Sequence, residues 1–255
     1  MLSSAHRRLL AAAIACLGLS AAGAHAATQI APHRAVYELS LAKARGSQPP
    51  SQVDGRMTFA WKDVCDGWSI EYDTDMELIF AKRGTQSVAW QYTSWESDDS
   101  TAMRFFLRRS MNGQQTLKRR GRAEKGPDGG TAVITEPERK EVPLDSATMF
   151  PGEHSRAILN AARKGERFLY APVFDGTGDN DGLFEANAVI LDSEGGNAPD
   201  LDSPLLADVP SWRINLAFFP PDDADGTPQS EQSVRYHANG VAGTLTLDYG
   251  DFVVR

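Results

Sequence analysis

The side chain best suited to chemistry is His154, which precedes Ser155 at the start of an alanine-rich segment. A histidine next to a serine could act as base and nucleophile, as in serine hydrolases. The serine lacks the G-x-S-x-G pattern of a nucleophile elbow, and His154 lies one helical turn before Ile158 on an apolar stripe. This placement favours a half-buried histidine between a helix and a sheet, and a hydrolase using His154 is the least favoured of the functions considered.

The other polar motifs do not form a metal or cofactor site. His33 and His237 lie in strand-like segments without the H-x-H or HExxH spacing of zinc sites. The run from Asp175 to Gly182 resembles a calcium loop, but Ala188 stands where the closing bidentate carboxylate belongs. We expect a solvated hairpin tip at this run, and we predict no catalytic, metal or cofactor-binding residues.

A basic segment lies between Met103 and Lys125, where eight residues are Lys or Arg and only Glu124 is acidic, giving a charge of +7. Asn112-Gly113 lies within it and favours a tight hairpin turn, so both arms of the hairpin would be basic. One interpretation is a solvated face that protects a sheet edge. The other is contact with an anionic envelope polymer, lipid headgroups or an acidic protein face. The candidate strip comprises Arg104, Arg108, Arg109, Lys118, Arg119, Arg120 and Arg122.

The first 26 residues have the pattern of a cleaved export signal. Arg7 and Arg8 precede an apolar run at 9–19, and Ala24-His25-Ala26 has the form that signal peptidase cuts. That run is too short to cross a bilayer, and no later segment is long enough, so no transmembrane anchor is predicted. We therefore expect a periplasmic protein whose mature chain, residues 27–255, forms a single domain.

The charge of the mature chain excludes one class of partner. Removal of residues 1–26 leaves 24 basic and 34 acidic residues, a formal net charge of −10. Nucleic acid binding depends on basic surface that neutralises phosphates, so nucleic acid is not an expected partner.

Cys65 is the only cysteine of that mature chain, because Cys16 leaves with the signal. It lies beside the Asp66-Gly67 turn, which favours an exposed thiol. In an oxidising compartment a lone cysteine indicates an intermolecular bridge, a lost partner or a tolerated free thiol. The bridge would be a Cys65–Cys65 dimer or a mixed disulfide.

The dominant pattern along the chain is an alternation of apolar and polar residues with period two. It is strongest from Trp68 to Phe80 and indicates strands with one wet and one dry face, which is typical of antiparallel sheets. Further strands are predicted at 37–41, 57–61, 87–95, 103–109, 116–123, 131–135, 168–174, 184–191, 212–218, 233–237, 244–249 and 252–254.

The sequence also predicts the turns and loops that separate these strands, and one helix. Turns are predicted at Asp54-Gly55, Asp66-Gly67, Asn112-Gly113, Asp128-Gly129, Asp175-Gly176 and Asp181-Gly182, and loops at 43–52, 192–210 and 220–230. One helix is predicted at 151–164, with Pro151 at its start, Glu153 in its first turn and Gly165 as its stop. The fold class is therefore mainly β with one packed helix.

Several segments together resemble a known family. In chain order they are His33-Arg34-Ala35-Val36-Tyr37, Trp61-x-x-x-Cys65-Asp66-Gly67-Trp68, Phe150-Pro151-x-x-His154, Phe174-Asp175-Gly176 and Asp248-Tyr249-x-x-Phe252. The set, which covers nearly the whole mature chain, is similar to the cell envelope integrity EipB-like family of alphaproteobacterial periplasmic proteins.

The resemblance implies an antiparallel β-spiral, an open barrel-like coiled sheet beside a helix, and a non-enzymatic role in the cell envelope. It implies a structural role for Trp61, Trp68, Phe150, Pro151, His154, Asp175 and Gly176. It also implies that a cysteine at the position of Cys65 pairs with one near the C-terminus, and this chain has none there.

Two functions remain open from the sequence. The first is a scaffold or adaptor that binds another envelope component, either an anionic one or a periplasmic protein, for which the resemblance suggests a helical-repeat protein. The alternative is a carrier that holds a lipid or another apolar ligand in the curved sheet, without any cofactor.

Overall fold

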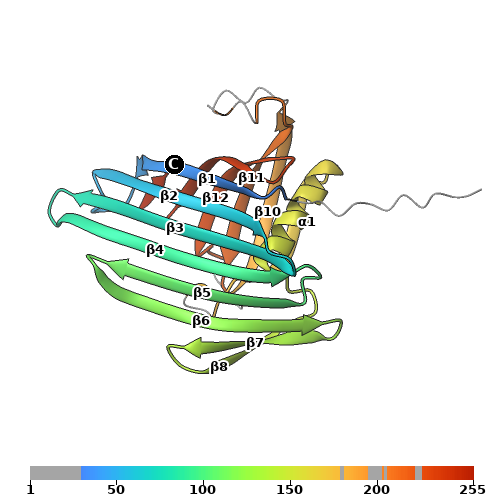
Figure 1. The fold of residues 1–255 in the computed structure, drawn as a ribbon. Coiled ribbons are helices and arrows are strands. Elements are labelled where there is room, and N and C mark those ends of the chain that lie inside the picture. Colours follow the sequence, from blue (N-terminus) through green and yellow to red (C-terminus); the bar gives the residue numbers. More distant parts are fainter. Residues whose placement is uncertain (1–29, 179–180, 195–202, 204–205, 222–225) are drawn as a thin grey trace, which may run out of the picture.

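Strands form the first half of the chain in a computed structural model that describes residues 30–178, 181–194, 203, 206–221 and 226–255. The alternating segments of the sequence become long strands (Figure 1). The apolar residues of each alternation are mostly the buried ones. They are β1 (His33–Ala44), β2 (Gln52–Asp63), β3 (Gly67–Phe80), β4 (Gly84–Ser97), β5 (Ala102–Met111), β6 (Gln114–Gly126), β7 (Gly129–Glu136) and β8 (Lys140–Leu144). The expected export signal and part of the loops at 192–210 and 220–230 lie outside the described residues.

The second half of the chain adds a helix and six more strands. They are α1 (Pro151–Arg163), β9 (Phe168–Phe174), β10 (Leu183–Glu194), β11 (Ser211–Phe219), β12 (Ser230–His237), β13 (Ala242–Asp248) and β14 (Phe252–Val254). Within the described residues, no helix combines the length and the apolarity that crossing a membrane requires.

All fourteen strands belong to one antiparallel sheet that coils into a spiral. The order runs from β8 back to β1, then from β14 back to β9, so β1 and β14 join the two halves. The two end strands, β8 and β9, do not pair with each other. Met149 partly fills the gap, because it pairs with Val173 of β9 and its N–H donates to Pro172 O at 2.8 Å. The structure confirms the predicted mainly-β spiral with one helix.

Helix α1 confirms the predicted segment 151–164. Pro151 stands at its first position, where a missing N–H costs nothing, and Gly165 follows with φ of +75°. Its buried residues Ile158, Ala161 and Ala162 pack against β10, β11 and β12. The helix therefore covers one part of the inner face, and its first turn reaches the opposite half of the sheet.

Two details differ from the sequence predictions. Asp54-Gly55 is not a turn but lies inside β2, where Gly55 pairs with Met76 and a Cβ would lie 2.6 Å from that side chain. Strand β8 was not predicted, because only two of its five residues are buried and apolar. The other three are Lys140, Glu141 and Pro143. Short edge strands with charges and proline are common where a sheet ends.

The core consists of four separate clusters rather than one. The first lies on β4–β8 with Phe150 and Phe174, and the second lies under α1 on β10–β12. The third joins β1–β3 to Val254 of β14, and the fourth packs Trp61 and Ile70 against Leu159 of the helix. The clusters are linked by partly buried residues, since Trp212 and Tyr236 pack against both the second and the fourth and Leu245 packs against the second and the third.

Candidate functional site

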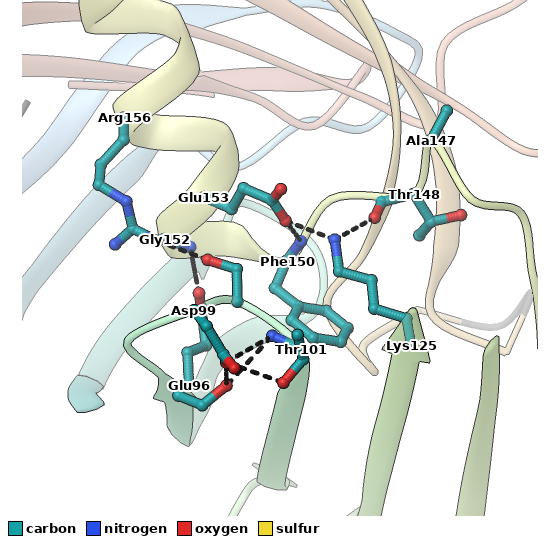
Figure 2. A network of polar contacts seen from close by, with 12 residues as sticks. Glu96, Asp99, Thr101, Lys125, Ala147, Thr148, Phe150, Gly152, Glu153 and Arg156 are labelled. Carbon is teal, nitrogen blue, oxygen red and sulfur yellow. Dashed lines mark hydrogen bonds and ion pairs between the residues drawn. The ribbon is translucent and has the colours of Figure 1, made fainter. Parts of the chain in front are cut away.

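The first turn of α1 is held by a buried carboxylate from the sheet. Its N-cap residue is Phe150, whose side chain cannot accept a hydrogen bond, so the helix begins without a cap of its own. Glu96, at the end of β4 and fully buried, takes that role: the N–H of Gly152 donates to its Oε1 at 2.8 Å and its Oε2 at 3.0 Å (Figure 2). A negative charge here matches the unpaired N–H groups and the positive end of the helix dipole.

The surroundings of Glu96 bring its ionisation close to neutral pH. Burial raises the pKa of this carboxyl to about 7, while the Gly152 N–H and the Arg156 guanidinium counteract the rise. Arg156 is itself oriented by donating to Ser100 Oγ at 2.8 Å. Glu96 was not among the predicted site residues, because it begins a polar segment, Glu96-Ser97-Asp98-Asp99, in which a charged side chain is expected to be solvated. Only the register, which places it on the inner face with Tyr92 and Ser94, indicates its burial.

A second contact ties the end of β6 to the same helix turn. Lys125 Nζ donates to Thr148 O and Glu153 Oε2, both at 2.6 Å, and lies 4.8 Å from the centre of the Phe150 ring (Figure 2). Glu153 also accepts the N–H of Phe150 at 3.3 Å. Lys125 is therefore part of the framework and is not free for a partner.

His154 is a core residue in the structure. It is 5% exposed, its Nε2 has no hydrogen-bond partner among the described residues, and burial lowers its pKa to about 4. Ser155 Oγ donates to Pro151 O at 2.9 Å, so no base–nucleophile pair is assembled here. The imidazole lies between helix and sheet, as the sequence favoured, but it is buried rather than half-buried.

The other motif residues lie in or beside the core. Trp61 is 3% exposed and its ring lies 5.9 Å from that of Trp68, while Phe150 is fully buried before Pro151. Gly176 has φ of +74°, and a Cβ on it would lie 2.4 Å from the Phe105 ring. These contacts fit a packing role.

The loop between β9 and β10 folds back onto the inner face of the sheet. The hydroxyl of Tyr92 donates to Asp175 O at 2.8 Å, and the Asp175 carboxylate accepts the N–H and hydroxyl of Thr177. Burial raises the pKa of Asp175 to about 6. The start of this loop is therefore buried, contrary to the expected solvated tip. No group of three or more His, Cys, Asp or Glu side chains placed for a metal occurs in the described part of the chain.

The basic hairpin of β5 and β6 distributes its charges over both faces of the sheet. Asn112 and Gly113 form the predicted turn with positive φ values of 52° and 75°. Arg109 and Arg119 share the inner face with Leu107, and Arg119 donates to the carbonyls of Thr177 and Gly178. The other five residues project from the outer face and are called the outer basic strip: Arg104, Arg108, Lys118, Arg120 and Arg122.

The outer basic strip brings like charges together. Arg104 lies directly opposite Arg122, and Arg108 lies opposite Lys118. Like charges in such cross-strand pairs are destabilising. Two guanidinium groups of the strip form cation–π contacts. Arg104 lies over the Trp95 ring and Arg120 lies over the Phe106 ring.

Not every charge of the strip has a partner. Lys118 pairs with Glu136 at 2.7 Å. No hydrogen bond or ion pair is formed by the side chains of Arg108 and Arg122 within the described residues. These two exposed guanidinium groups are therefore available to an anion.

A groove of about 560 Å³ lies beside the strip, lined mostly by outer-face residues of β1–β5 and also by Phe59, Tyr72 and Tyr92. Phe106, between Arg104 and Arg108, forms one of its walls. Its other walls are largely polar, and Lys62 pairs with Glu71 there at 2.6 Å. The groove therefore borders the strip at Phe106.

Cys65 lies at the turn between β2 and β3. It is exposed and has φ of 62°. The exposure agrees with the sequence prediction, while the position carries no packing that would depend on the thiol.

We expect a fraction of the oxidised protein to migrate as a Cys65–Cys65 dimer or as a mixed disulfide, because an exposed thiol meets no second cysteine in its own mature chain. Cys65→Ser should abolish the dimer and change the free energy of unfolding by less than about 1 kcal/mol. Non-reducing electrophoresis checks this directly. A monomer whose thiol reacts only after denaturation would contradict it.

Comparisons with known proteins agree in the family that they indicate. A family model described as EipB-like matches residues 24–255. The chain is 27% identical over 241 residues to the cell envelope integrity protein EipB of Brucella abortus (strain 2308), covering 92% of this chain and 85% of that protein. A crystal structure of a beta-barrel-like protein of a domain of unknown function from Brucella abortus has a TM-score of 0.81 at 24% identity, over 90% of this chain and 96% of that one. The structural likeness shows a shared fold.

Proposed function

Since the chain belongs to the EipB-like family, we propose that it is a non-enzymatic periplasmic adaptor that maintains envelope integrity by binding an acidic protein through the outer basic strip. The envelope role is supported by the name of its Brucella relative, cell envelope integrity protein EipB. The export signal of the sequence supports the periplasm as the place where it acts.

The observation that carries the binding surface is the pairing of like charges on internal strands. The sequence left open that these charges protect a sheet edge. Four of the five residues of the strip, Arg104, Arg108, Arg120 and Arg122, have a paired strand on both sides, and only Lys118 lies where β6 extends beyond β7. The cross-strand pairs Arg104–Arg122 and Arg108–Lys118 cost stability. An acidic partner would offset that cost, and it would gain strongly oriented hydrogen bonds from the guanidinium groups.

An acidic protein suits this surface better than a membrane. The mature chain carries a net charge of −10, although its basic segment carries +7. An extended anionic surface would repel the rest of the molecule, whereas a protein with a limited acidic patch contacts the strip alone. The adjoining groove of about 560 Å³ offers a concave polar surface for such a partner.

The absence of catalysis is part of the proposal. The best candidate base, His154, is buried, and its low pKa keeps it neutral, while Ser155 bonds to its own helix. The walls of the outer groove hold an ion pair, Lys62–Glu71, rather than a base beside a nucleophile.

Reversal of two charges tests the surface. The variant Arg108→Glu/Arg122→Glu should lose retention of an acidic envelope protein, because both side chains are exposed and form no hydrogen bond or ion pair within the described fold. Immobilised wild-type protein should retain that partner from envelope extract at about 50 mM salt and release it by about 300 mM, as screening shortens to below about 8 Å.

Lys43→Glu/Lys82→Glu is the matched control, since it changes the net charge equally at exposed positions away from the strip. It should retain the same protein as the wild type. Melting temperatures of all three proteins should agree closely. Retention of the same partner by the strip variant, or a partner released only by detergent, would contradict the proposal.

A further inference from the structure

Tyr72 in the middle of β3 is exposed on the inner side of the sheet. Its strand partners are Phe59 on β2 and Tyr92 on β4, and Tyr92 in turn pairs with the buried Leu107, so all four side chains share the inner face. Tyr92 is 6% exposed, as an inner residue should be, but Tyr72 is 37% exposed. An inner side chain with that much accessible surface borders a space that admits water.

Residues of several core clusters surround that space. Tyr37 packs against the third cluster, Phe59 against the fourth, Tyr92 belongs to the first, and Tyr236 packs against the second and fourth. The ring of Tyr72 contacts Phe59 at the fourth cluster and Tyr92 of the first. We call this space the central chamber and define it by Ala35, Tyr37, Phe59, Tyr72 and Tyr236.

The walls of the central chamber are aromatic. The rings of Phe59 and Tyr72 are 5.1 Å apart, and those of Tyr72 and Tyr92 are 5.7 Å apart, so three strands contribute to one aromatic surface. Ala35 of β1 lies opposite Phe59 and is only half-buried, which leaves room on that side. Such walls suit an apolar chain or ring.

One polar group in the chamber has no partner. The hydroxyl of Tyr37 donates to Ala242 O and that of Tyr92 to Asp175 O, both at 2.8 Å. The described residues offer no hydrogen bond to the hydroxyl of Tyr72. Leaving a hydroxyl unpaired in an enclosed site is costly, so water or a ligand group completes it.

The charges around Tyr72 disfavour an anion. Burial, Tyr236 and the carboxylates of Asp175 and Glu96 raise the pKa of Tyr72 well above its usual value, so the phenol remains a neutral donor. The groups with the largest effect on it include no basic side chain. The basic side chain of Arg119, on the same face, is bound to the carbonyls of Thr177 and Gly178. A fatty acid or phosphate group would therefore be repelled here, unlike an uncharged group.

We propose that the central chamber binds an uncharged amphiphile, with an apolar chain or ring against the aromatic walls and one hydroxyl or carbonyl paired with the Tyr72 hydroxyl. This site lies on the inner face, and its function is independent of the outer basic strip. The chain would thus carry a small ligand in addition to contacting a protein partner.

Fluorescence titration with the neutral probe N-phenyl-1-naphthylamine tests the site in the full mature protein. The fluorescence of the probe should increase when it binds, and 1-decanol should displace it. Decanoate at pH 8 should need a concentration at least about 10-fold higher than 1-decanol for the same displacement. Ala35→Trp should fill the chamber and abolish probe binding. Val36→Trp is the matched control, because the next residue of β1 is 48% exposed on the outer face and should leave binding unchanged.

Tyr72→Phe keeps the wall and removes only the hydroxyl. It should lower the affinity for 1-decanol about 3- to 10-fold, which is the effect expected for one hydrogen bond, and leave the affinity for the probe unchanged. The proposal fails if decanoate competes as well as 1-decanol, if Tyr72→Phe binds both ligands normally, or if folded Ala35→Trp still binds the probe. If Ala35→Trp does not fold, the Tyr72→Phe and decanoate results decide alone.

Discussion

Replacing Gly152 by alanine is expected to destabilise the protein by about 2–4 kcal/mol, although alanine is normally the better helix residue. A Cβ at this position would lie 2.6 Å from Glu96 Oε2 and 3.0 Å from the Trp61 ring. Both neighbours are almost fully buried and cannot move into solvent. The added methyl group therefore both overpacks the site and separates the Glu96 carboxylate from the helix N-terminus.

Urea denaturation measures this change, and Gly126→Ala provides the matched control. A Cβ on Gly126 has no neighbour within 4 Å, so the same substitution there should change the free energy of unfolding by no more than about 0.5 kcal/mol. Equal stabilities of the Gly152 and Gly126 variants would show that Glu96 does not hold the helix.

Replacing Glu96 by glutamine is expected to make the protein progressively more stable than the wild type as the pH rises from about 4.5 to about 8. Burial raises the pKa of folded Glu96 from 4.5 to about 7, so the folded state binds the proton more tightly than the unfolded state. Its favourable contribution is complete below pH 4.5 and is lost as the pH rises through 7. The loss amounts to roughly 2–3 kcal/mol.

Glutamine keeps an acceptor for the Gly152 N–H and carries no charge to bury, so the variant should not show this loss. The quantity to measure is the difference in the free energy of unfolding between the two proteins at each pH, because other groups also change the stability of the wild type with pH. His154 acts in the opposite sense, because its pKa falls from 6.5 to about 4 and its contribution is lost as the pH decreases through that range.

Glu136→Gln supplies a control of opposite sign. Its hydrogen bond with Lys118 lowers the pKa of Glu136, so the glutamine variant should become less stable than the wild type as the pH rises. Unfolding midpoints in urea at several pH values give both differences. Parallel profiles for wild type and Glu96→Gln would contradict the buried carboxylate.

Local patterns were sufficient for most of the fold. The alternation from Trp68 to Phe80 sets the inner face of β3, and Asn112-Gly113 and Pro151 mark a hairpin and a helix that the structure confirms. These features depend on neighbouring residues, so the sequence reveals them. Asp54-Gly55 misled because glycine also serves close packing inside a strand.

The site depends on contacts between distant residues, which local patterns do not reveal. Glu96 and Gly152 are 56 positions apart, and nothing near either residue indicates the other. The basic segment was visible as composition, but the register decides that Arg108 faces outwards while Arg109 faces the inner side. The exposure of Tyr72 on the inner face likewise depends on the pairing of distant strands.

The most direct test of the adaptor function is the lowest detergent concentration that stops growth of a strain lacking the protein. Expression of the wild type or of Lys43→Glu/Lys82→Glu should restore resistance to the level of the parent strain. Arg108→Glu/Arg122→Glu should accumulate to the same level in the periplasm and leave the strain sensitive. Full resistance with the strip variant would contradict the claim that the outer basic strip carries the function in the envelope.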